Sequence, residues 1–165
     1  MLRVFWGLAL ADGIVLVGAA LLGAVARGER GVYQHVGLGV FAALLTCLVH
    51  AVVFTYFTAT GKMMRQALAL GKLDGAIDAR IRRSKQRISR AVAVAVFTLI
   101  VTVAAGAAYL RVPGSGVPGY VHVTAALLAL AANLWAFAVE AGLIAANAAL
   151  MDAVFTEYQR RMGKS

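Results

Sequence analysis

The residues best suited to chemistry in this sequence are ionisable side chains that interrupt long apolar segments. Asp12, His50 and Glu140 each lie inside such a segment. An ionisable group in hydrocarbon needs a partner, which makes each of the three a candidate functional residue. Two carboxylates and one imidazole can hold and pass a proton. They could also bind a metal ion, but no ligand spacing within a single segment supports that, and we predict no metal site.

Further polar residues share a helix face with this trio. At about 100° per residue, one narrow stripe of the last apolar segment carries four polar side chains: His122, Asn133, Glu140 and Asn147. A face of the second segment carries His35, Thr46 and His50. These stripes should face the interior of a bundle. The sequence therefore predicts a buried polar network: Asp12, Thr46, His50, Asn133, Glu140 and Asn147. Thr98 should lie near its inner layer.

The other two histidines stand in similar surroundings. Residues 31–36 and 119–123 both carry glycine, tyrosine and valine around a histidine, and His122 follows His35 by 87 residues. Two helical hairpins of the same orientation would form a parallel repeat. Such a repeat would bring His35 and His122 to one depth, near one membrane surface.

Two neutral imidazoles on facing helices are the axial ligands that a b-type haem requires. Gly37 and Gly39, close to His35, would leave room for a flat macrocycle. Three arginines near the same surface could contact the propionates: Arg27, Arg30 and Arg111. A haem site at His35 and His122 is therefore one hypothesis.

The apolar segments themselves predict membrane spans. The chain has 165 residues, of which 62% are hydrophobic and 14% charged, whereas about a quarter of a soluble domain is charged. Apolar runs cover about 4–26, 36–59, 91–110 and 121–150, and each reaches the roughly 20 residues that a span needs. We predict an all-α integral membrane bundle of four transmembrane helices in a single domain, 1–165.

Lysine and arginine are distributed unequally between the two sides of this bundle. Thirteen of the 16 fall at residue 3, within 62–90 or within 160–164, and the remaining three are at 27, 30 and 111. Cytoplasmic loops carry the excess of such residues. The sequence therefore predicts a multi-pass protein of a bacterial-type inner membrane, with both termini in the cytoplasm.

The segment from about 60 to 90 is the main extramembrane piece. Its apolar residues recur at helical spacing beside a basic face: Leu70, Leu73, Ile77, Ile81 and Ile88. We predict that the second and third helices continue into the cytoplasm as a hairpin that turns between Gly71 and Gly75, with 151–165 as a cytoplasmic tail. The segment 62–90 could lie near anionic headgroups or dock a cytoplasmic partner.

Three functional hypotheses follow. The first is a non-catalytic subunit with a structural or assembly role in a larger bacterial membrane complex such as a respiratory one, partnered by lipid and other membrane subunits. The second is a b-type haem electron-transfer subunit, and the third is a proton or ion pathway through Asp12, His50 and Glu140. The chain has no catalytic motif, so we expect no catalytic activity of its own. Its basic residues flank apolar runs, so we expect no nucleic-acid partner.

Overall fold

A bundle of four long helices makes up the described part of the chain. The computed structural model describes residues 1–71, 75–111 and 118–163, without the side chain of residue 111. The helices are α1 (Leu2–Val25), α2 (Gly28–Leu70), α3 (Gly75–Arg111) and α4 (Gly119–Met162). Each is long and apolar enough to cross a membrane. The predicted all-α class and its four apolar helices are confirmed.

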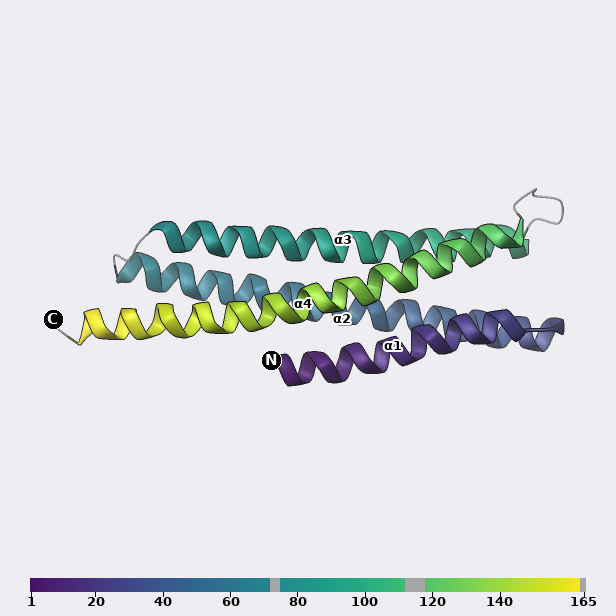
Figure 1. Ribbon diagram of the computed structural model, residues 1–165, viewed down its shortest axis with the longest axis horizontal. Helices are drawn as coiled ribbons and strands as arrows, with labels where there is room; N and C mark the ends of the chain where they lie inside the picture. The colour runs from purple at the N-terminus through teal and green to yellow at the C-terminus, as the bar shows by residue number, and fades with distance from the viewer. Residues whose placement is uncertain (72–74, 112–117, 164–165) are drawn as a thin grey trace.

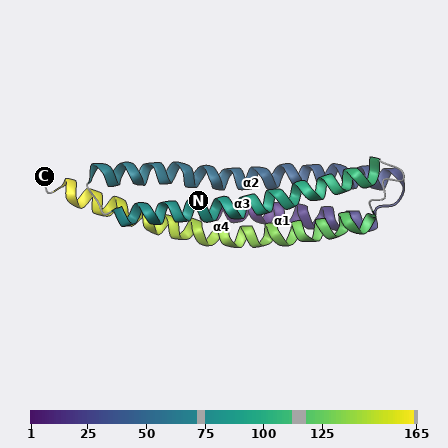
Figure 2. The same cartoon turned by 90° about the horizontal axis from the view of Figure 1, so that it is seen from above.

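Three of the helices run the whole length of the bundle, and the fourth is shorter. α2, α3 and α4 extend from end to end, whereas α1 accompanies them over one part only (Figure 1). α1 and α3 each pack against α2 and α4, and α2 and α4 also touch each other. We call the end where α1 meets α2 the turn end, and the opposite end, near the C-terminus, the basic end. Figure 2 shows the same arrangement from above.

The turn between α1 and α2 depends on a glycine. Only Ala26 and Arg27 separate the two helices, and Gly28 has a φ of 65°. This left-handed conformation is open to glycine and strained for most other residues.

The helix interiors are uninterrupted because both prolines of the chain, at 113 and 118, lie between α3 and α4.

The outer surface of the bundle is apolar, and its centre is lined by small residues. Leu10, Leu44 and Phe97 are each 66% exposed. Soluble proteins rarely expose contiguous apolar surface of this kind. Ala42, Ala95 and other alanines are buried between the helices, which allows close approach of the backbones. Both features are those of a bundle solvated by lipid.

At the basic end, three helices form a core of their own. Met64, Leu68, Ile81 and Val154 are buried together there, drawn from α2, α3 and α4. α2 ends at Leu70 and α3 begins at Gly75, on either side of the predicted turn. Within the predicted apolar stripe Ile81 and Ile88 are buried. Leu70 is 69% exposed, and residue 73 lies outside the described residues.

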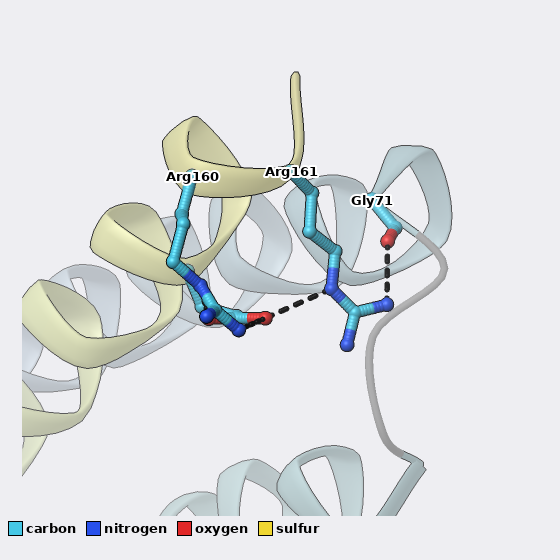
Figure 3. Close-up of polar contacts among 4 residues, drawn as sticks. Gly71, Arg160 and Arg161 are labelled. Atoms are coloured by element: carbon cyan, nitrogen blue, oxygen red, sulfur yellow. Dashed lines mark hydrogen bonds and ion pairs between the residues drawn. The ribbon is translucent and has the colours of Figure 1, made fainter. Parts of the chain in front are cut away.

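The end of α4, expected as a tail, is a packed helix that closes this core. Arg161 donates from Nη1 to the Gly71 carbonyl at 3.3 Å, where α2 ends and carbonyls lack helical partners (Figure 3). Arg160 and Arg161 both donate to Glu157, at 2.8 and 2.9 Å. The hydrogen bond from Arg160 is the main cause, and the bond from Arg161 the second, of a Glu157 carboxyl pKa lowered to about 2. The bond to Gly71 joins the end of α4 to the end of α2.

Candidate functional site

The two histidines 87 residues apart face each other near the turn end. His35 lies on α2 and His122 on α4, with ring centroids 5.9 Å apart and ring planes inclined by 70°. Both side chains are half-buried. The predicted proximity of this pair is therefore present in the structure.

Each imidazole is held by a backbone carbonyl of the preceding helix. His35 Nδ1 lies 3.1 Å from the Ala19 carbonyl oxygen, and His122 Nδ1 lies 3.1 Å from that of Thr102. A carbonyl only accepts, so each Nδ1 carries the hydrogen and donates it. In a neutral ring Nε2 then has a free lone pair. This is the arrangement that orients metal-ligating histidines.

Two glycines make room for these rings. A Cβ on Gly23 would lie 2.6 Å from Cε1 of His35, and one on Gly106 would lie 2.9 Å from Cε1 of His122. A Cβ on Gly37 or Gly39 would meet nothing within 4 Å, and the room that these two would leave for a macrocycle stays a prediction. The imidazole rings themselves owe their space to a different pair, Gly23 and Gly106. The space needed is on the neighbouring helix.

The glycine contact gives a prediction with a matched control. Gly106→Ala should lower the stability of the bundle, because its methyl group displaces the His122 ring. Gly37→Ala should be neutral or stabilising by up to about 1 kcal/mol, since alanine is the better helix former and its methyl group meets open space. Unfolding of both variants in mixed micelles checks this. Equal effects of the two substitutions would contradict the packing role of Gly106.

The arginines predicted beside these histidines have different surroundings. Arg27 donates from Nη1 to the carbonyls of Ala26 and Ala24, at 2.8 and 3.4 Å. It thus caps the last carbonyls of α1. Arg30 is exposed. The side chain of residue 111 lies outside the described residues, so a propionate contact by any of the three stays a prediction.

Deeper in the bundle, His50 is enclosed by two polar partners from α4. His50 Nδ1 lies 2.7 Å from Oε1 of Glu140, and its Nε2 lies 3.0 Å from Oδ1 of Asn133. All three residues are at most 1% exposed. His50 and Glu140, expected in one buried network, thus contact each other directly.

The hydrogen-bond partners locate the protons of this group. Asn133 donates its amide to the Ala129 carbonyl at 2.7 Å, which leaves Oδ1 as the acceptor toward His50. His50 Nε2 therefore carries a hydrogen. Between Nδ1 and Glu140 there is one further proton, bound either to the imidazole or to the carboxyl. The His50–Glu140 contact thus holds a single shared proton inside the bundle.

The remaining members of the predicted network form separate pairs. Thr46 is 3.0 Å from Oδ1 of Asp12 and 2.9 Å from the Ala42 carbonyl. Asn147 donates to the Thr60 hydroxyl at 3.0 Å, a partner that sequence reasoning missed. The hydrogen bonds among the described residues thus divide the expected network into three groups.

Thr98 was expected near the inner polar residues. Among the described contacts, its hydroxyl bonds only to carbonyls of its own helix, α3. Its hydroxyl lies 3.0 and 2.9 Å from the carbonyls of Val94 and Ala95. Within the predicted polar network, two carboxylate oxygens have no hydrogen-bond partner among the described residues: Oδ2 of Asp12 and Oε2 of Glu140. Both are buried, where an unsatisfied polar atom is unfavourable.

No protein-family model, curated protein or solved structure matches this chain.

The side chains available to hold a metal can be read from the geometry. In the described ranges no group of three or more histidine, cysteine, aspartate or glutamate side chains could hold a metal ion. His35 and His122 offer two nitrogen ligands at one place. Two imidazoles are the number of protein ligands that the haem hypothesis requires.

Proposed function

We propose that this chain is an integral membrane subunit of a larger assembly and that it holds a b-type haem between His35 and His122 for electron transfer. The observation that carries the proposal is the paired geometry of the two imidazoles, with ring centroids 5.9 Å apart. His35 and His122 would be the two residues that hold the haem, because a b-type haem takes two imidazole ligands from the protein.

The residues of the chain have distinct tasks in this proposal. Each imidazole binds through Nε2, while the carbonyls of Ala19 and Thr102 fix its orientation through Nδ1. Gly23 and Gly106 leave the rings the space they occupy. A bound haem would supply one-electron chemistry. The first hypothesis from the sequence, a subunit with a structural or assembly role, assigns no chemistry to the Nε2 atoms of this pair.

We also propose that the two helical hairpins are parallel repeats. His122 follows His35 by 87 residues and Asn147 follows Thr60 by 87. The supporting residues on α1 and α3 follow a second offset: Gly106 follows Gly23, and Thr102 follows Ala19, by 83 residues. The difference of four residues falls in the longer connection between α3 and α4. The same carbonyl and glycine contacts at both histidines support a common origin of the two halves.

The proposed orientation sets the basic end and both termini in the cytoplasm, with the histidine pair toward the outer surface. A reporter fused after Ser165 or inserted at Gly75 should be cytoplasmic, and one inserted at residue 116 should be outside. The reason is the excess of lysine and arginine at the basic end. Alkaline phosphatase and fluorescent-protein fusions measure it, and the inverse pattern would contradict it.

The reduced-minus-oxidised absorption spectrum of the chain purified from membranes tests the haem proposal. We expect the Soret and α bands of a six-coordinate haem, retained in mild detergent. A folded chain that shows neither band, and gains none on addition of haemin, would contradict it.

A second candidate function, proton transfer, is favoured by the inner polar groups. Buried aspartate, glutamate and histidine side chains are the groups that form proton relays in membranes, and His50 and Glu140 share a proton here. The same contacts would equally fix the register of α2 against α4. Variants that separate these roles are described in the Discussion.

A further inference from the structure

A basic hollow lies on α3 near the basic end of the bundle. Its volume is about 540 Å³, and it is lined by six residues: Ala79, Arg82, Arg83, Lys85, Gln86 and Ser89. Asp78 pairs with Arg82 and partly neutralises it. The charges of Arg83 and Lys85 remain for an anion.

An apolar groove of about 340 Å³ continues from this hollow toward the turn end. Phe54 of α2 forms one side of the groove, and Val92, Val96, Phe97 and Ile100 of α3 form the other. Phe54 is 39% exposed and Phe97 is 66% exposed, so both rings are open to the surroundings.

The hollow and the groove are physically connected. Ser89 lines both of them. The Lys85 ammonium lies 5.7 Å from the centroid of the Phe54 ring, at the boundary between the charged and the apolar part. The two depressions therefore form one amphipathic depression on the surface of α3. We call it the surface channel; it is not a pore.

The position of this channel matches the boundary of a membrane. Ser89 precedes the apolar run 91–110 by two residues, about 3 Å of helix rise. Arg83 is about 12 Å from the start of that run by the same measure. The basic hollow is thus level with lipid headgroups, and the groove is level with the acyl chains.

We infer that this channel binds an anionic phospholipid, with the phosphate in the basic hollow and one acyl chain in the groove. Basic pockets beside membrane helices recognise such headgroups. A free phosphate would leave the groove unused. A cytoplasmic protein would have to enter the hydrocarbon to reach Phe97 and Ile100. The site is independent of the histidine pair, and it identifies the basic segment as a lipid contact.

Native mass spectrometry of the detergent-purified chain tests this site. With equal amounts of phosphatidylglycerol and phosphatidylcholine, the chain should retain the anionic lipid about tenfold better, because two cations face the headgroup. The variant Arg83→Gln/Lys85→Gln should lose this preference. Lys62→Gln/Arg80→Gln removes the same charge outside the channel and should keep it.

A groove variant and a competitor complete the experiment. Ala93 also lines the groove, and Ala93→Trp should fill it and reduce retention of both lipids at unchanged helical content. Glycerol 3-phosphate should not displace phosphatidylglycerol. Equal loss in both charge variants would mean general charge attraction, and displacement by glycerol 3-phosphate would mean a site for free phosphate. Retention of neither lipid would favour a cytoplasmic protein as the partner of this surface. Each of these results would overturn the proposal.

Discussion

His35→Ala and His122→Ala are each expected to abolish the haem absorbance of the purified chain. A haem held by two imidazoles loses its six-coordinate state when either one is removed. Both rings are supported in the same way, by one carbonyl and one glycine each, so neither should be dispensable. The measurement is the Soret and α-band absorbance per chain in detergent, with a fall to near background for both variants.

The third histidine of the chain provides the control. His50 lies deeper in the bundle and bonds to Glu140 and Asn133. His50→Gln should therefore retain the bands. Loss of absorbance in only one of the two outer variants would mean a different ligand set, and survival in both would end the haem proposal.

Glu140→Leu is expected to destabilise the bundle by about 1–3 kcal/mol, because it leaves His50 Nδ1 without a partner in a buried site. Glu140→Gln should be milder, since the amide still bonds to the imidazole. Asp152→Asn, the same carboxylate-to-amide change at an exposed position of the same helix, should change stability little. Unfolding in mixed micelles measures all three. A leucine variant as stable as the parent chain would show that the contact contributes nothing.

The Glu140→Gln variant also distinguishes proton transfer by His50 and Glu140 from a role in fixing the register of α2 against α4. In sealed liposomes, a proton route through Glu140 should lose its flux in Glu140→Gln while the chain stays folded. A contact that only fixes helix register would leave any flux unchanged. If the parent protein shows no proton flux, proton transfer is not its function.

Much of the fold could be predicted from the apolar runs, because a membrane span is specified by length and composition alone. The contact of His50 with Glu140 followed from helix rotation and rise, which fix the face and depth of a residue on its own helix. The supporting role of Gly23 and Gly106 could not be predicted in that way. It depends on how neighbouring helices are placed beside α2 and α4, and only the offset of 83 residues signalled it.

The end of α4 shows a second limit of the sequence. The sequence predicts a cytoplasmic tail for residues 151–165 and no packing partner for it. Met151, Val154 and Tyr158 nevertheless recur at helical spacing and pack on the core of the basic end. That stripe has a partner only because α2 and α3 continue past the apolar runs, and the lengths of three helices must be known together to recognise it.

The inner polar pair departs from the proposed repeat. The residues 87 positions from His50 and Glu140 are Phe137 and Val53, both apolar. Phe137 lies against His50, with ring centroids 5.5 Å apart. The outer histidines thus occur in both halves, whereas the shared proton occurs once. Under the repeat, duplication supplied the paired imidazoles and later divergence supplied the inner pair.

The amount of haem bound per chain tests the central claim most directly. The chain would be purified from membranes in mild detergent, with haem supply not limiting, and its non-covalent haem quantified against protein. The proposal predicts one b-type haem per chain, lost in both outer histidine variants. A folded, monodisperse chain that carries less than about one haem per ten chains, before and after addition of haemin, would contradict it.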